Sequence, residues 1–144
     1  MILPFARARE RGYAFETGRP VSFPFIRNTE KAPYLAGRFQ QDIEPAGRYL
    51  LLDEDPNRPL VRGWVRGDVS FDAPLVLRWG EAYDETSWKY AIAEHYRTTG
   101  RALSRRILKD GFDAIVTVGD DGLTREIVDL RPAALPRRRN RGDR

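Results

Sequence analysis

The strongest constraint on the fold of this chain is segment 111–130, which reads GFDAIVTVGDDGLTREIVDL. Its two runs, 112–118 and 123–130, are rich in β-branched and other apolar residues and flank a Gly-Asp-Asp-Gly sequence typical of a tight turn. The pattern predicts a β-hairpin. A two-residue type I′ turn at Asp121 and Gly122 would set its register.

That register places Glu126 on an apolar face of the hairpin. It predicts three facing pairs: Val118 with Arg125, Thr117 with Glu126, and Val116 with Ile127. Glu126 then shares its face with aliphatic side chains, namely Ile115, Val128 and Leu130. A carboxylate in such surroundings is costly unless it is paired, hydrogen-bonded or set at a cleft. Glu126 is therefore either a strand-edge residue that pairs with Arg125 or solvent, or a functional carboxylate.

Length and composition restrict the classes of protein and of site. A chain of 144 residues suits one domain with a single core. The absence of cysteine excludes disulfides and thiolate metal sites and fits a reducing interior. The one histidine, His95, excludes a multi-histidine metal centre, and a Ser-His-Asp arrangement would have to use it as the base. No stretch approaches the roughly 20 apolar residues of a membrane span, and no signal peptide is recognisable.

Positive charge is concentrated at the C-terminal end. Residues 131–144 hold six arginines and one aspartate, whereas residues 1–130 hold 19 basic and 20 acidic side chains. The high isoelectric point therefore belongs to the tail, which contains two prolines and little apolar surface. We expect residues 131–144 to be disordered and to attract polyanions weakly. The arginines that could make such a nucleic-acid contact are Arg137, Arg138, Arg139 and Arg141.

The remaining elements follow from periodicity and turn residues. Residues 1–20 are expected to form a loosely held arm and residues 21–130 one domain. Strands are predicted at 21–27, 48–52, 60–71 (one bulged strand or two short ones) and 75–79. Pro24 should place the first of these at a sheet edge or a bulge. This order, followed by helices and a closing hairpin, predicts an α+β fold with a split, mostly antiparallel sheet.

Two helices are predicted between the last of these strands and the hairpin. The first spans residues 88–98, with Ser87 as its N-cap and Gly100 as its end. The second spans residues 101–110, with Gly111 just beyond its C-terminus.

Three tripeptides place polar side chains where a predicted strand begins or ends: Arg27-Asn28-Thr29, Gly47-Arg48-Tyr49 and Thr124-Arg125-Glu126. An arginine, a small hydroxyl, an aromatic ring and a carboxylate together suit a ligand that carries phosphates and an aromatic ring. Arginine grips pyrophosphate bidentately, the ring can stack, and the carboxylate can stabilise an oxocarbenium-like cation.

In this order, the three tripeptides and the Gly111-Phe112-Asp113-Ala114-Ile115 motif resemble the ADP-ribosyltransferase family of NAD-cleaving toxins and polymerases. The match covers about residues 23–130 and is closest in character to small phage or prophage members. The resemblance implies an ADP-ribosyltransferase-like fold, NAD as the substrate, no metal, and a place in the cytoplasm of a bacterial host. It also implies transfer of ADP-ribose to an unknown macromolecular acceptor, or hydrolysis of NAD.

The resemblance also implies a role for individual residues. Glu126 would be catalytic and contact the nicotinamide ribose, and Arg27 would hold the phosphate or ribose. Thr29 and the backbone of Gly47 would seat the nicotinamide, and Tyr49 would stack on it. Thr124 occupies the position where many members carry a second Glu or Gln that orients the acceptor. The middle strand also lacks the Ser-Thr-Ser pattern of one subgroup, so transfer, hydrolysis and non-catalytic binding all stay open.

These residues also have structural alternatives. Arg27 could pair with Glu30 or Asp42, Tyr49 could be a core ring, and Gly47 a turn glycine. Segment 40–44 carries two carboxylates that suit either a ligand or an ordinary polar loop, and His95 suits a partly exposed helix position. The alternative function is a non-enzymatic phage or prophage protein that binds nucleic acid or another protein through its arginines.

Overall fold

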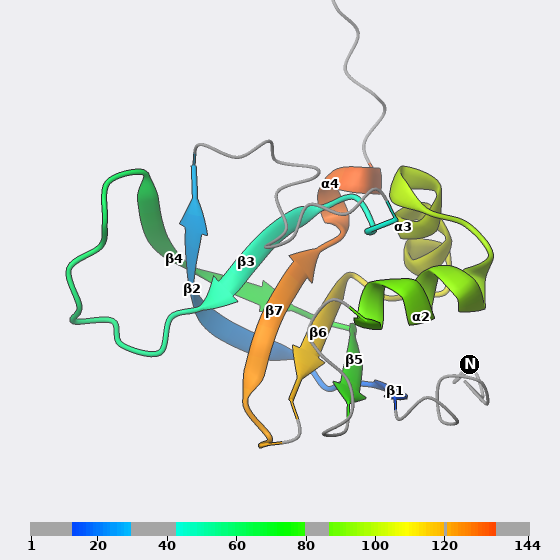
Figure 1. Ribbon diagram of the computed structural model, residues 1–144, viewed down its shortest axis with the longest axis horizontal. Helices are drawn as coiled ribbons and strands as arrows, with labels where there is room; N and C mark the ends of the chain where they lie inside the picture. The colour runs from blue at the N-terminus through cyan, green and yellow to red at the C-terminus, as the bar shows by residue number, and fades with distance from the viewer. Residues whose placement is uncertain (1–12, 30–42, 80–86, 120, 135–144) are drawn as a thin grey trace, which may run out of the picture.

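The computed structural model describes residues 13–29, 43–79, 87–119 and 121–134, and shows an α+β fold in that part of the chain (Figure 1). The strands are β1 (Tyr13–Thr17), β2 (Val21–Asn28), β3 (Arg48–Leu52), β4 (Trp64–Phe71), β5 (Pro74–Trp79), β6 (Ala114–Val118) and β7 (Thr124–Asp129). The helices are α2 (Ser87–Tyr96), α3 (Gly100–Lys109) and α4 (Arg131–Ala134). None of the helices in these ranges is long and apolar enough to cross a membrane.

The strands form one mixed sheet in the order β1-β5-β6-β7-β3-β2-β4. Every neighbouring pair is antiparallel except β5 and β6, which are parallel and joined through α2 and α3. The predicted α+β class and the mostly antiparallel sheet are confirmed. The junction between β2 and β3 is narrow, because only two residue pairs join these strands, Phe25 with Leu52 and Ile26 with Leu51.

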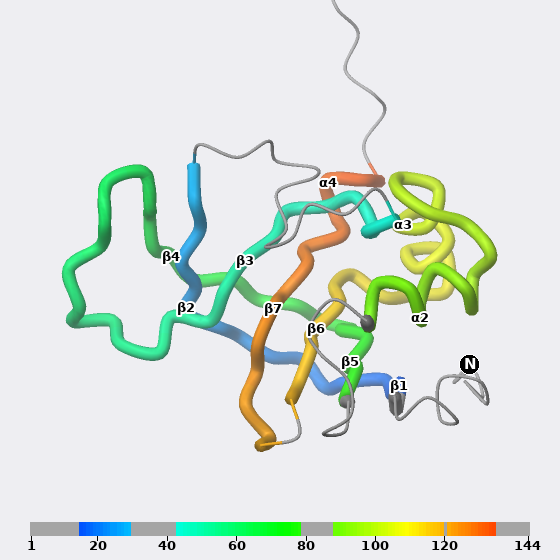
Figure 2. Tube along the Cα trace, in the orientation of Figure 1, coloured from blue at the N-terminus to red at the C-terminus, as the bar shows by residue number. Residues whose placement is uncertain are grey.

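Each face of the sheet carries its own apolar core. On one face, α2 and α3 pack against β3, β5, β6 and β7 through fully buried side chains such as Trp88, Ile92 and Leu103. On the other face, β2 and β4 contribute Phe25 and Phe71 to a cluster with β3, β6 and β7. Figure 2 shows the start of β2 and the end of β4 crossing behind the central strands, so the sheet folds back over itself.

The closing hairpin is confirmed, with one correction to its turn. Val116 faces Ile127 as predicted, but Val118 faces Thr124 and not Arg125. The register of the two strands shifts at a bulge between Val116 and Val118. A type I′ turn needs positive φ at both central residues. In the structure a longer loop closes the hairpin: the Gly119 N–H donates to the Leu123 carbonyl, and the N–H of Gly122, which has a φ of +79°, donates to the Gly119 carbonyl.

The ends of the helices differ partly from the prediction. α2 ends at Tyr96, where Arg97 takes a φ of +57°, and Gly100 begins α3 and does not terminate α2. The predicted end of α3 is confirmed. Gly111, with a φ of +100°, and Phe112 donate backbone hydrogen bonds to the carbonyls of Leu108 and Ile107, which is the pattern of a glycine-terminated helix. The side chain of Ser87 lies outside the described part, so its capping role stays a prediction.

Two segments predicted to be loose contain regular structure. Residues 13–17 of the expected arm form β1, which pairs along its whole length with β5. Residues 131–134 of the expected tail form α4, whose Ala133 is buried against the domain. Regular structure therefore extends into both the expected arm and the expected tail. Residues 1–12 and 135–144, including Arg137, Arg138, Arg139 and Arg141, lie outside the described residues.

Pro24 shows why β2 tolerates a proline although it is an internal strand. The Pro24 carbonyl accepts a hydrogen bond from the Asp53 N–H (2.9 Å), so this side of the strand faces the loop after β3. Regular pairing with β3 begins only at Phe25. The backbone N–H that proline lacks would therefore point toward this loop, where no hydrogen bond between strands is lost. Segment 60–71 likewise resolves into a loop followed by the single strand β4.

Candidate functional site

Glu126 lies in a row of side chains that crosses three strands. Ile26 of β2 faces Leu51 of β3, and Leu51 faces Glu126 of β7, so all three point to the face of the sheet that carries α2 and α3. Glu126 is only 4% exposed. Its backbone is fixed by Thr117, whose hydroxyl accepts from the Glu126 N–H and donates to the Glu126 carbonyl, both at 2.8 Å.

A fully buried lysine joins Glu126 to a second carboxylate. The Lys89 ammonium lies 2.6 Å from Oε2 of Glu44 and 3.8 Å from Oε1 of Glu126. Lys89 and Glu44 are 0% exposed. We call these three residues the buried ionic cluster. With all three groups ionised, its net charge is −1.

The cluster leaves one buried acceptor free. Oε1 of Glu44 has no hydrogen-bond partner among the described residues. A buried polar atom without a partner costs about 1–3 kcal/mol, and more when it is charged. Such an atom indicates that the cluster is not optimised for stability alone.

Tyr49 lies beside the cluster and not at an open surface. Its ring is 4% exposed, its hydroxyl donates to the Pro45 carbonyl (2.6 Å), and the Lys89 ammonium lies 5.2 Å from the ring centroid. Burial raises the pKa of the Tyr49 hydroxyl well above its usual value, and the charges of Glu44 and Glu126 add to this effect. The structure therefore brings the predicted stacking residue next to the predicted catalytic residue, but covers its ring.

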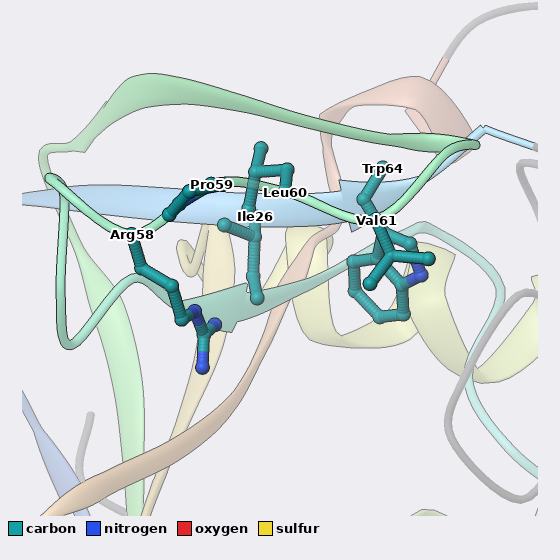
Figure 3. Close-up of a pocket in the computed structure, with 6 residues that line it drawn as sticks. All are labelled: Ile26, Arg58, Pro59, Leu60, Val61 and Trp64. Carbon is teal, nitrogen blue, oxygen red and sulfur yellow. The ribbon is translucent and has the colours of Figure 1, made fainter.

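Two hollows continue the row of Glu126 toward the surface. The first, of about 240 Å³, is the β3–β7 pocket, lined by Ile26, Leu51, Leu52, Glu54, Arg58, Thr124 and Arg125. The second, of about 410 Å³, is the β2–β4 pocket, lined by Ile26, Arg58, Pro59, Leu60, Val61 and Trp64 (Figure 3). They share Ile26 and Arg58, so they are adjacent parts of one open surface.

The two pockets differ in chemistry. The β2–β4 pocket is mostly apolar and has the indole of Trp64 as its one aromatic wall, with the Arg58 guanidinium extending at its side (Figure 3). The β3–β7 pocket is more polar and carries Arg58, Thr124 and Arg125. Arg125 also forms an ion pair with Asp121. A ring-bearing anion would find an apolar surface at one end and guanidinium groups at the other.

Arg27 lies apart from this surface. Because neighbouring residues in a strand point to opposite faces, Arg27 points away from the face shared by Ile26 and Glu126. The structure thus brings Glu126, Tyr49 and Thr124 to one region and leaves Arg27 on the other face. Its suggested partners Glu30 and Asp42 lie outside the described residues.

Thr29 and Gly47 have structural roles where they lie. Both the N–H and the hydroxyl of Thr29 donate to the Gly63 carbonyl, at 2.7 and 2.9 Å, which closes the end of the β2–β4 ladder. A Cβ on Gly47 would lie 2.6 Å from the carbonyl oxygen of Asp129, so only glycine allows β7 to approach this closely. Neither residue lines the two described pockets.

The Gly-Phe-Asp-Ala-Ile motif organises the fold around the site. The Asp113 carboxylate accepts hydrogen bonds from the backbone N–H groups of Asp72 and Ala73, at 2.7 and 3.2 Å, and so fixes the turn between β4 and β5. Phe112 and Ile115 are buried in the core beneath the helices. The motif therefore sets the position of β6, against which Glu126 is held.

Sequence reasoning missed Lys89 and the role of Glu44. A signal for Lys89 was present, because it falls at helical spacing with Ile92, Ala93 and Tyr96 on the buried face of α2. A lysine on that face needs a buried anion. Glu44 was assigned to an ordinary polar loop or a ligand site, and nothing local in the sequence indicates that it meets a lysine 45 residues away.

The other candidate residues do not form a metal or ligand site in the described part of the chain. Within the described ranges no group of three or more His, Cys, Asp or Glu side chains could hold a metal ion. His95 is half-buried with its ring edge against Tyr96, and burial lowers its pKa while Asp110 raises it by a smaller amount. Trp88 is fully buried in the core.

Comparisons with protein-family models, with curated proteins and with solved structures find no match to this chain.

Proposed function

We propose that the protein cleaves the N-glycosidic bond of NAD, releasing nicotinamide and transferring ADP-ribose to an acceptor or to water. The observation that carries the proposal is the row Ile26, Leu51 and Glu126. Two of its members line an open pocket, and the third is a carboxylate in a buried cluster of net charge −1. The proposal includes the ADP-ribosyltransferase-like architecture, which the narrow β2–β3 junction and the folded-back sheet support.

The chemistry requires a negative charge beside the ribose. When the bond between the ribose C1 and the nicotinamide nitrogen breaks, its electron pair leaves with neutral nicotinamide and the ribose becomes an oxocarbenium-like cation. A fixed anion stabilises this cation in surroundings that contain little water. The acceptor then bonds to C1 and loses its proton. Glu126 supplies the anion, and the net charge of the cluster keeps it negative despite the lysine beside it.

The phosphates need cations that lie on the same face as Glu126. Arg58 meets this condition, because it lines both pockets and forms no ion pair with any described residue. Arg27 points to the other face, so we assign the phosphate contact to Arg58. Thr124, which lines the β3–β7 pocket, would lie where the acceptor approaches.

The Arg58 assignment is tested by calorimetry with NAD. A hydrogen bond to a charged group contributes about 1.5–3 kcal/mol, so Arg58→Ala should weaken NAD binding about 10- to 100-fold. Arg27→Ala serves as the matched arginine control and should bind NAD like the parent. The reverse result would return the phosphate site to Arg27 and its face of the sheet.

The burial of Glu126 sets a condition on the mechanism. With 5% of its side chain exposed, the carboxylate meets the ribose only if the ligand enters between Leu51 and Thr124 and uncovers it. Solvent is then excluded from the reacting carbon, which favours transfer over hydrolysis when an acceptor is bound.

Release of nicotinamide from NAD tests the function itself. Glu126→Gln keeps the shape of the side chain but removes its charge, so turnover should fall about 100- to 1,000-fold while NAD still binds. Glu16→Gln, on the exposed edge strand β1, is the matched control and should retain the parent's turnover. Equal turnover of the Glu126 variant and the parent would refute the assignment.

The second candidate function, binding of nucleic acid or a protein through arginines, has one observation in its favour. Arg58 and Arg62 are exposed on the loop between β3 and β4, which extends away from the sheet at the end opposite α2 and α3 (Figure 2). If the parent releases no nicotinamide and binds DNA or RNA with steep salt dependence, this function replaces the first.

A further inference from the structure

We infer that Lys89 is a positioning residue for Glu126: tethered by Glu44, its ammonium keeps the Glu126 carboxylate ionised and fixed in place beneath the β3–β7 pocket. The inference rests on the proposed function, because it assigns a role in the same reaction. Lys89 lines neither of the described pockets and is fully buried, so it acts through Glu126 and not on the ligand.

The geometry fixes Glu126 from two sides. Thr117 of β6 binds its backbone through two hydrogen bonds of 2.8 Å, and Lys89 of α2 lies 3.8 Å from Oε1 of its side chain. The lysine is itself held, because its ammonium lies 2.6 Å from Glu44 and 5.2 Å from the centroid of the Tyr49 ring. A buried lysine with these contacts has little freedom to move.

The charges explain why the cluster contains two carboxylates. A lysine paired with Glu126 alone would neutralise it and remove the field that a cationic ribose needs. Glu44 lies closer to the ammonium than Glu126 does, 2.6 against 3.8 Å, and takes up most of its charge. The cluster thus leaves a net negative charge at Glu126 while still opposing its protonation.

Among the described residues, the titratable groups that face Glu126 are Lys89 from α2, Glu44 from the segment before β3, and Tyr49 from β3. From β6 the facing side chain is Thr117, which does not titrate in this range. On β7 itself, the neighbouring Arg125 is paired with Asp121. Within the described part of the chain, Lys89 and Glu44 are therefore the charged groups expected to act most strongly on the protonation of Glu126.

The direct test is a titration of the Glu126 carboxyl carbon by ¹³C NMR, with the resonance assigned by its absence in Glu126→Gln. In Lys89→Met the midpoint should rise by about 1–3 pH units, because an opposite charge within a few ångströms is lost. In Glu44→Gln it should fall by about 1 unit, since the ammonium then acts on Glu126 alone. Lys89→Arg retains the charge and should titrate close to the parent.

Lys109→Met, on the exposed surface of α3, is the matched lysine control and should leave the midpoint unchanged. If Lys89→Met does not fold, the fall of the midpoint in Glu44→Gln, together with an unchanged midpoint in Lys89→Arg, decides the matter. An unchanged midpoint in Glu44→Gln, or a shift in Lys109→Met as large as that in Lys89→Met, overturns the inference.

The pH dependence of turnover is a second measurement, which would not change if Lys89 had only a structural role. The acid limb of the kcat–pH profile should follow the NMR midpoint of each variant, while KM for NAD changes little. A parent that releases no nicotinamide refutes the proposed function, but the NMR midpoints still report whether Lys89 controls Glu126. An acid limb that stays in place while the NMR midpoint moves overturns the role of Lys89 in the reaction.

Discussion

Replacing Lys89 by methionine should destabilise the protein strongly, and by an amount that depends on pH. Methionine keeps most of the side-chain volume but removes the ammonium that lies 2.6 Å from Glu44 and 3.8 Å from Glu126. Two buried carboxylates would then face each other without a cation. Removing one partner of a buried ion pair typically costs about 3–5 kcal/mol.

The free energy needed to protonate one of the two glutamates gives a similar value for the loss of stability. An ordinary glutamic acid titrates near pH 4.3, so protonating one at pH 7 costs about 4 kcal/mol and at pH 5 about 1 kcal/mol. The loss of stability in Lys89→Met should therefore be about 3–5 kcal/mol at pH 7. It should shrink toward about 1 kcal/mol at pH 5, because the relieving protons bind more easily as the pH falls.

Urea unfolding followed by circular dichroism measures both values. At pH 7 the change corresponds to a decrease in Tm of about 10–20 °C for a domain of this size. Lys109→Met removes an exposed lysine from α3 and should stay within about 0.5 kcal/mol of the parent at both pH values. A loss in Lys89→Met below about 1 kcal/mol at pH 7, or an equal loss at pH 5 and pH 7, would refute the description of the cluster as ionised.

Three further predictions concern other parts of the fold. Burial lowers the pKa of His95, so the free energy of unfolding should fall as the pH drops below about 6.5, and His95→Gln should abolish this slope in pH-dependent urea unfolding. Gly47→Ala should cost about 1–3 kcal/mol in the same assay because its Cβ would meet the backbone of β7, and an unchanged stability would contradict that packing. Ending the chain after Ala134 should preserve the Tm, whereas ending it after Leu130 should lower the Tm because α4 is lost. Equal Tm values for the two truncated proteins would show that α4 does not stabilise the fold.

Local patterns predicted the elements that carry the site. The β-branched runs around a turn gave the β6–β7 hairpin, and its alternation placed Glu126 on the helix-covered face. The loop between the two strands is longer than the predicted two-residue turn, since the Gly119 N–H donates to the Leu123 carbonyl, and the sequence Asp-Asp-Gly is compatible with either length. This difference changes the register of β6 and β7 only beyond the bulge after Val116, next to the loop.

The contacts that define the candidate site could not be predicted because they are not local. Glu44 and Lys89 lie 45 residues apart, and their pairing depends on how α2 crosses the sheet. The face on which Arg27 lies is set by two residue pairs between β2 and β3, which no periodicity in either strand encodes. Arg58 lies in a loop whose composition indicates only a turn. In each case the residue type was visible in the sequence and its neighbours were not.

The central claim is that NAD binds in the β3–β7 pocket, next to Glu126. The most direct measurement is a titration of ¹⁵N-labelled protein with NAD, followed by backbone amide and tryptophan indole shifts. We predict the largest changes at Leu51, Thr124 and the Trp64 indole, with little change at Arg27 on the opposite face. Changes confined to the face of Arg27, or none at millimolar NAD, would contradict it.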